Sequence, residues 1–172
     1  MSNIKPSQMS QAAFVDFFGG VFEHSPWVAE QAFLRGVNSA SDEHEALHAA
    51  LCAVFRAAER GQRLTVLRAH PDLAGRLAAA KRLTIASASE QSAAGLDALT
   101  DDERSRFIDL NSQYTTRFGF PFILAVRGRN KFEILSLFER RIKNDPETEF
   151  ETACREVEQI AAHRLRGLLQ EK

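Results

Sequence analysis

The stretch Phe122-Ile123-Leu124-Ala125-Val126 is the one continuous apolar run of this 172-residue chain that is bounded by turn residues. A short run of this kind fits a buried strand and a buried helix equally well, because periodicity does not distinguish the two. No second run offers a convincing strand to pair with it. We therefore expect residues 122–126 to be an extended or helical part of the core in an all-α fold.

Helix signals flank this run on both sides. Before it, Thr100-Asp101-Asp102-Glu103 has capping-box spacing, and the helix that it begins should end near Phe118-Gly119-Phe120-Pro121. After it, Asn130 should cap a helix over residues 132–142. Asp145-Pro146 then supplies a cap and a proline at the first position of the last helix. The C-terminal half is therefore predicted to be helical on both sides of the apolar run.

The N-terminal half has the same character. Ser10 should cap a helix that stops at Gly19-Gly20, and Ser87-Ala88-Ser89-Glu90 has the capping-box spacing that begins another helix. Further helices are expected over residues 27–36, 42–60 and 71–81. We predict one helical domain over residues 1–172, built as a bundle of about seven to nine helices.

Composition and charge exclude several classes of protein. The chain is 44% hydrophobic and 26% charged, with a net charge of −1 and no long basic block, which argues against a nucleic-acid partner. No apolar run approaches the length of a membrane span, and the N-terminus lacks a signal-peptide core. Cys52 and Cys154 lie far apart on predicted helices and are expected to be reduced core thiols. These features predict a cytoplasmic protein with no membrane partner.

The stretch Arg68-Ala69-His70-Pro71-Asp72-Leu73-Ala74-Gly75 places an imidazole at a helix junction. Proline disfavours the α conformation of the residue before it, so His70 should end one helix in an extended conformation. Pro71 suits the first turn of a following helix, although Gly75 weakens that helix. A histidine fixed in this way is a candidate for acid–base chemistry near neutral pH. The alternative is a surface or core histidine beside an ordinary turn.

A second histidine motif, His44-Glu45-Ala46-Leu47-His48, matches the H-E-x-x-H pattern of zinc proteases. Histidines four residues apart lie on one helix face, and the glutamate can act as a base. Against this interpretation, no later segment offers a clear third ligand, and an acidic first helical turn explains the glutamate through the helix dipole. Zinc binding at His44 and His48 is therefore the less favoured hypothesis.

Ser87 and Glu90 are explained as a capping box without any function. The functional alternative is that this helix N-terminus presents free amides to an anionic substrate, while the Glu90 carboxylate orients an imidazole such as His70. Arg164 falls on the apolar stripe of the last helix, where an unpaired charge is costly. Either its stem packs while its head reaches solvent, or its guanidinium faces a cavity and receives a substrate carboxylate or amide.

Together these segments resemble the 2-oxo-4-hydroxy-4-carboxy-5-ureidoimidazoline (OHCU) decarboxylases of urate degradation. The resemblance depends on four blocks in order: residues 70–75, residues 87–91, Phe118-Gly119-Phe120-Pro121-Phe122-Ile123, and the pattern from Glu156-Val157 to Arg164-Leu165. It implies an all-helical homodimer and a reaction without metal or organic cofactor, in which the substrate loses CO2 and becomes (S)-allantoin.

The resemblance also implies a role for each matching residue. His70 is expected to be the catalytic acid, Glu90 its partner, and Pro71 part of the lining of the site. The expected substrate contacts are Ser87, Ala88, Ser89, Glu90, Gln91, Phe122, Ile123, Leu124, Ala125, Val126 and Arg164. Two other classes stay open from the residues alone: a zinc hydrolase using His44 and His48, and a non-catalytic helical binding module.

Overall fold

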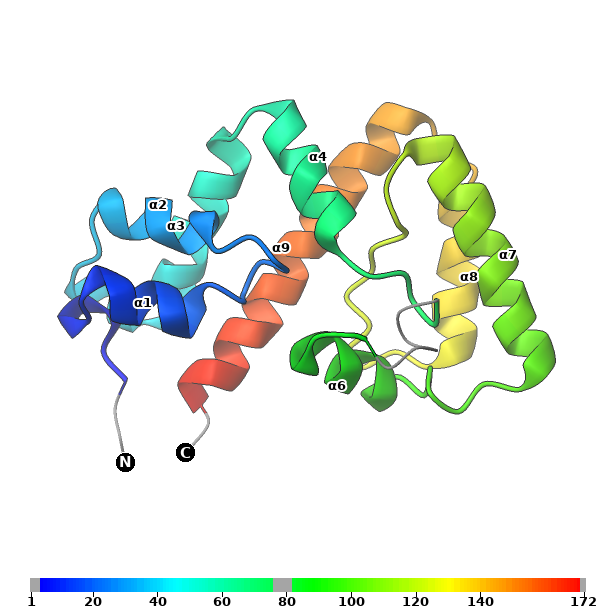
Figure 1. Cartoon of the computed structure of the whole chain (residues 1–172), viewed down its shortest axis with the longest axis horizontal. Helices are drawn as coiled ribbons and strands as arrows, with labels where there is room; N and C mark the ends of the chain where they lie inside the picture. Colours follow the sequence, from blue (N-terminus) through cyan, green and yellow to red (C-terminus); the bar gives the residue numbers. More distant parts are fainter. Residues whose placement is uncertain (1–3, 76–81, 171–172) are drawn as a thin grey trace. The chain divides into compact units, whose positions relative to one another are not determined.

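The computed structural model of the chain describes residues 4–75 and 82–170. Within these ranges every regular element is a helix and there is no strand, which confirms the all-α prediction. Figure 1 shows the helices in chain order. Their bounds are α1 (Gln11–Phe18), α2 (Trp27–Leu34), α3 (His44–Ala57), α4 (Arg60–Ala69), α6 (Ile85–Ala93), α7 (Asp101–Phe118), α8 (Lys131–Arg141) and α9 (Pro146–Gln170), with 3-10 turns at Pro6–Gln8 and Ser39–Asp42.

The chain divides into two compact units. Unit 1 comprises residues 1–69 and 158–172, and unit 2 comprises residues 70–157. Helix α9 therefore contributes its first part to unit 2 and its last part to unit 1. The expectation of one domain over the whole chain stays a prediction, and each unit is described by itself.

Unit 1 is built on an aromatic core. Helix α2 packs on both α1 and α3, and the Phe14, Phe18, Phe22 and Phe55 rings are almost fully buried. Ser10 accepts a hydrogen bond from the amide of Ala13, as predicted for the cap of α1. These contacts bury the apolar sides of short helices that would be marginal in isolation.

Unit 2 has its own core around Tyr114. In Figure 1, α7 and α8 run side by side. The Tyr114 ring meets Phe122 and Phe138 edge-on, and Phe122 stacks on Phe138 with ring centroids 3.9 Å apart. The capping box predicted at Thr100 is present at the start of α7, and Asn130, predicted as a cap, forms a capping box with Glu133 at the start of α8. Helix α7 is capped at its C-terminal end by Gly119, whose φ of 77° is the left-handed conformation that glycine adopts without strain.

Two expectations about helix bounds are wrong. Residues 71–75 form a turn and no helix, and the remainder of the helix predicted to reach Lys81 lies outside the described residues. The helix expected to begin at Ser87 starts earlier, at Ile85, because Thr84 is the cap and its hydroxyl accepts from the Ser87 amide at 3.2 Å. Ser87 is thus inside the first turn, with its side chain buried.

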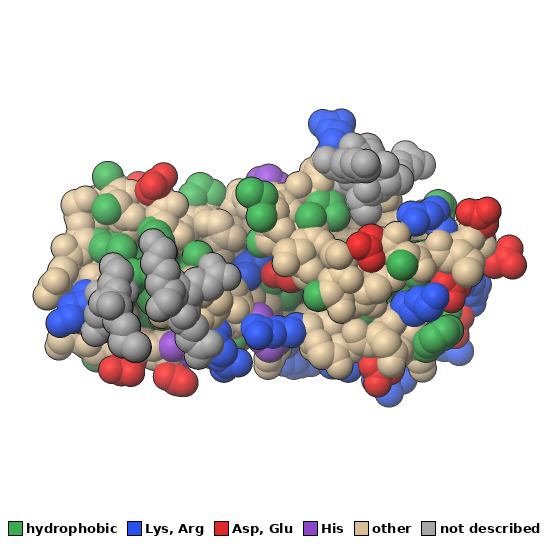
Figure 2. All heavy atoms as spheres, turned by 90° about the horizontal axis from the view of Figure 1, so that it is seen from below, with side chains coloured by type: hydrophobic (Ala, Val, Ile, Leu, Met, Phe, Trp, Pro, Cys, Tyr) green, Lys and Arg blue, Asp and Glu red, His purple; other side chains and the backbone are tan. Residues whose placement is uncertain are grey.

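The surface carries charges of both signs. On the face drawn in Figure 2, basic and acidic side chains are interspersed, in keeping with the small net charge. In the described part of the chain, every helix is too short or too polar to cross a lipid bilayer. Cys52 and Cys154 are both buried free thiols, as expected.

Candidate active site

His70 directly follows the last residue of α4 and opens the turn over residues 70–75, here called the His–Pro loop. The prediction that a helix ends at this histidine is confirmed. His70 is 7% exposed. An imidazole that is largely shielded from water has a restricted environment, which is the condition for a positioned acid or base.

Two side chains of unit 2 fix the backbone of the His–Pro loop. The Gln91 side chain accepts from the Ala74 amide at 2.9 Å and donates to the Asp72 carbonyl at 3.3 Å. The Asn111 amide group of α7 donates to the Leu73 carbonyl at 2.9 Å. Three consecutive residues of the loop are therefore held by buried amides from α6 and α7.

The loop is also strained. Ala74 has a φ of 51°, in the left-handed region that costs an L-residue roughly 1–2 kcal/mol. Gly75 follows, and a Cβ atom at that position would lie 2.3 Å from the Cβ of Asp72. The turn thus requires glycine at 75 and external hydrogen bonds at 74. Strain of this kind persists where surrounding contacts over-determine the backbone, often next to a functional site.

Helix α6 presents the predicted contact residues 87–91 on different faces. Ser87 and Gln91, one turn apart, are buried on the inner face, Glu90 is half-buried, and Ala88 and Ser89 are exposed. The sequence did not predict that Gln91 supports the loop that carries His70. The pairing of Glu90 with His70 stays a prediction.

Residues 122–126, here called the extended segment, are part of the core, as the sequence predicted, and of the two conformations left open, extended or helical, they adopt the non-helical one. Four of the five residues are buried, and Ala125 is half-buried. The Phe122 ring lies between Phe138 and the Arg141 guanidinium, whose carbon is 4.5 Å from the ring centroid. The extended segment therefore offers a small accessible surface at Ala125, and its large side chains serve the core.

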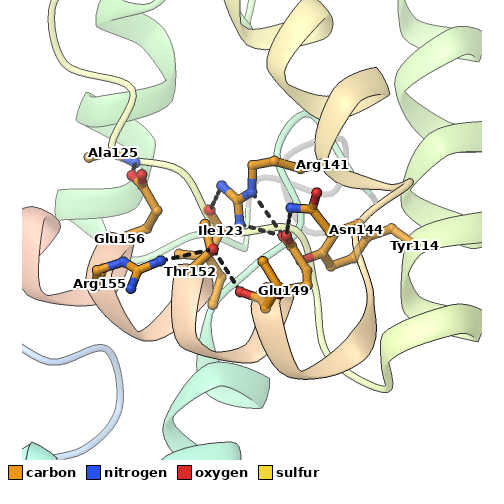
Figure 3. A network of polar contacts seen from close by, with 10 residues as sticks. Tyr114, Ile123, Ala125, Arg141, Asn144, Glu149, Thr152, Arg155 and Glu156 are labelled. Atoms are coloured by element: carbon orange, nitrogen blue, oxygen red, sulfur yellow. Dashed lines mark hydrogen bonds and ion pairs between the residues drawn. The ribbon is translucent and has the colours of Figure 1, made fainter.

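A buried charge network lies behind the extended segment (Figure 3). Arg141 donates to Glu149 Oε1 through Nε at 2.9 Å and through Nη2 at 2.6 Å. Tyr114 also donates to this carboxylate, and Asn144 donates to its other oxygen at 2.9 Å. Burial raises the pKa of Tyr114, and the negative charge of Glu149 adds to the shift, so the phenol stays a donor. Hydrogen bonds to both oxygens of the Glu149 carboxylate offset the cost of removing the two charges from water.

Arg164 belongs to unit 1 and is buried, so the interpretation that its head reaches solvent is wrong. Its Nη1 lies 2.6 Å from Glu23 Oε2, with side-chain exposures of 7% and 2%, and it donates to the Gly20 carbonyl at 3.3 Å. Sequence reasoning missed Glu23. The available signal was an acidic residue directly after the apolar pair Val21-Phe22.

The His44 and His48 side chains fasten α3 to the part of α9 in unit 1. Their Nε2 atoms lie 3.0 Å from the Ala162 carbonyl and 2.8 Å from the Glu158 carbonyl. A carbonyl oxygen only accepts, so both Nε2 atoms carry the proton in these contacts. Among the described residues, no group of three or more His, Cys, Asp or Glu side chains has the arrangement of a metal site. The contacts between α3 and α9 therefore account for both histidines of the H-E-x-x-H motif.

A cavity of about 450 Å³ in unit 2 lies between the His–Pro loop and α7. Asp72 and Gly75 line it from the loop, and Asn111 and Ser112 line it from α7. Residues 87–91 and 122–126 do not line it. The cavity therefore touches the predicted site only through the turn after His70.

The family model described as OHCU decarboxylase matches residues 7–166 of this chain. The chain belongs to the OHCU decarboxylase family. Since the match includes the His–Pro loop, α6, the extended segment and Arg164, the blocks that carried the resemblance all lie inside it.

Individual members of the OHCU decarboxylase family are similar over nearly the whole chain. A 2-oxo-4-hydroxy-4-carboxy-5-ureidoimidazoline decarboxylase of Haloferax volcanii is 42% identical over 92% of this chain and 90% of its own length. The crystal structure of an (S)-allantoin synthase superposes with a TM-score of 0.76 at 35% identity, covering 95% of this chain and 52% of that longer chain. An OHCU decarboxylase crystallised in the presence of (S)-allantoin gives a TM-score of 0.67 at 26% identity, covering 84% and 92%.

Proposed function

We propose that this chain decarboxylates OHCU to (S)-allantoin in urate degradation, with His70 as the catalytic acid. The observation that carries the proposal is a family match over residues 7–166 that includes a buried histidine on a strained, doubly supported loop. Relatives that match over nearly their full length carry the name of this activity.

The chemistry suits the residue types. When the bond from the ring carbon to the carboxylate breaks, CO2 leaves and the electron pair forms a C=C bond to the neighbouring carbon. The π electrons of the C=N bond move to the nitrogen, which takes up a proton to give an enamine. Protonation of the enamine carbon on one face, with loss of the hydroxyl proton on the neighbouring carbon, yields allantoin as a single enantiomer. In our proposal His70 delivers or relays that proton, and Glu90 holds the imidazole in one tautomer and orientation.

The remaining residues bind the substrate in this proposal. Pro71 lines the site beside His70, and residues 87–91 and 122–126 contact the ring and its ureido group. Arg164 receives a carboxylate or amide, which its planar guanidinium suits. The protein is further proposed to act as a cytoplasmic homodimer without metal or organic cofactor. Size-exclusion chromatography with light scattering tests the dimer, and unchanged turnover in a chelator tests the absence of a metal requirement.

The deciding experiment follows circular dichroism after OHCU is generated from urate by the two preceding reactions. The protein should give one allantoin enantiomer rapidly, while uncatalysed decay is slow and racemic. His70→Asn should lower kcat by about 10²–10⁴-fold, the range for loss of a general acid, with an unchanged helical spectrum. Glu90→Gln should lower kcat with little change in Tm. Substantial turnover by His70→Asn would contradict the assignment, and decay unaffected by the wild-type protein would overturn the function.

A further inference from the structure

The backbone of the extended segment is held by side chains, in the absence of a neighbouring strand in the described structure. Arg141 Nη1 donates to the Ile123 carbonyl at 2.8 Å. The Ala125 amide donates to Glu156 Oε2, also at 2.8 Å. Figure 3 shows these two contacts on the same stretch of chain, one before Leu124 and one after it. Both involve a charged partner, which makes them stronger than ordinary amide hydrogen bonds.

Both contacts depend on one face of α9. Glu149 and Glu156 are seven residues apart, so they lie two turns apart on the same side of the helix. Glu149 acts through Arg141, whose guanidinium it binds with two hydrogen bonds, and Glu156 acts directly. Helix α9 thereby fixes the position and the rotation of the peptide groups around Leu124.

We propose that Arg141 and Glu156 are positioning residues for the decarboxylation, because they set the backbone of the extended segment against the substrate. The inference rests on the proposed function, in which residues 122–126 contact the substrate. Neither side chain needs to touch the reacting atoms. Loss of one contact frees a peptide group that has no strand neighbour to hold it, and displacements near 1 Å cost as much as 10²-fold in rate.

Glu156 gives the sharper test because it is half-buried, whereas removal of Arg141 would leave the Glu149 carboxylate buried without its cation. Glu156→Ala removes the acceptor for the Ala125 amide. Glu156→Gln keeps an acceptor oxygen on a side chain of the same size and removes only the charge. Glu139→Ala is the matched control, since it breaks an exposed ion pair with Arg106 in the same unit and contacts neither Ile123 nor Ala125.

The experiment measures kcat, KM, Tm and amide hydrogen exchange at Ala125 for the wild type and the three variants. A charge-assisted hydrogen bond contributes about 1.5–3 kcal/mol, so Glu156→Ala should lower kcat/KM by about ten- to a hundred-fold and speed exchange at Ala125. Glu156→Gln keeps a neutral hydrogen bond of about half that strength, so kcat/KM should fall by about three- to ten-fold. Glu139→Ala should match the wild type.

The outcomes separate this inference from the proposed function. A Glu156→Ala protein with lower Tm but unchanged kcat/KM would show a purely structural role and overturn the positioning role alone. Equal losses in the Ala and Gln variants would also overturn it, because the retained acceptor would then have no effect. An inactive wild type would overturn the proposed function and the positioning role together.

Discussion

Gln91→Leu should destabilise the His–Pro loop with little change in side-chain size. In the wild type the Gln91 side chain is 5% exposed and forms hydrogen bonds to both Ala74 and Asp72. Leucine fills the space and forms neither bond. Because Ala74 is 1% exposed, its amide would lose its acceptor in a place that water reaches poorly.

The magnitude follows from the two bonds. A buried amide left without an acceptor costs about 1–3 kcal/mol, and the longer, part-buried bond to the Asp72 carbonyl adds about 0.5 kcal/mol. A loss near 2–3 kcal/mol in the free energy of unfolding corresponds to a fall in Tm of about 4–12 °C for a chain of this size. The left-handed conformation of Ala74, roughly 1–2 kcal/mol uphill, would then lack its main support, and His70 would move with the loop.

Equilibrium denaturation in urea, amide hydrogen exchange at Ala74 and kcat for OHCU measure these effects together. We expect a lower denaturation midpoint, faster exchange at Ala74 and a lower kcat. Gln113→Leu is the control, because it makes the same change at an exposed position of α7. If the free energy of unfolding of Gln91→Leu lies within about 0.5 kcal/mol of the wild-type value and the Ala74 amide stays protected from hydrogen exchange, the loop does not depend on this side chain.

Two further predictions concern unit 1. Glu23→Gln should lower the free energy of unfolding by about 3–5 kcal/mol, because it leaves Arg164 buried without its anionic partner. The control Glu139→Gln, at the exposed pair with Arg106, should lower it by under about 1 kcal/mol. Similar urea midpoints for the two variants would contradict this prediction. Burial, and next the charge of Glu158, raises the pKa of the Cys52 thiol to about 12, so Cys52 should resist alkylation at pH 8 until the protein unfolds. The neutral Cys52 thiol contributes to the stability of the folded protein in full below its ordinary pKa near 9, and this contribution is lost as the pH rises towards 12. Cys52→Ala should therefore lack this part of the loss of stability at alkaline pH. Rapid alkylation of Cys52 in the folded protein at pH 8 would refute the prediction.

The helices with strong local signals could be predicted from the sequence. The caps at Thr100 and Asn130 depend on residues three apart, and proline fixes the break after His70, so no distant contact is needed to predict them. The start of α6 could not be placed in this way. Thr84 and Ser87 are both capable caps, and the burial of Ser87 in the core of unit 2 decides between them.

The partners of the candidate site residues depend on contacts that sequence spacing does not encode. Arg164 could be identified as a charge on an apolar stripe, but its partner Glu23 is brought to it only by folding of unit 1. Gln91 could be identified as a candidate site residue because it lies in the block 87–91, whereas its hydrogen bonds to the His–Pro loop could not be predicted. The pair His44 and His48 shows the converse case. Carbonyls four residues apart on an adjacent helix match the same histidine spacing that a metal ion would use.

The extended segment has a consequence for protein engineering. In a sheet, each backbone group belongs to a ladder, and a local change is resisted by every rung. Residues 122–126 instead depend on single side chains, such as Arg141 at Ile123 and Glu156 at Ala125. Exchange of one such side chain for a longer or shorter one offers a way to reshape a single peptide group while the helices keep their places. Libraries directed at these supporting positions, rather than at the apolar run itself, are the natural route to altered substrate range.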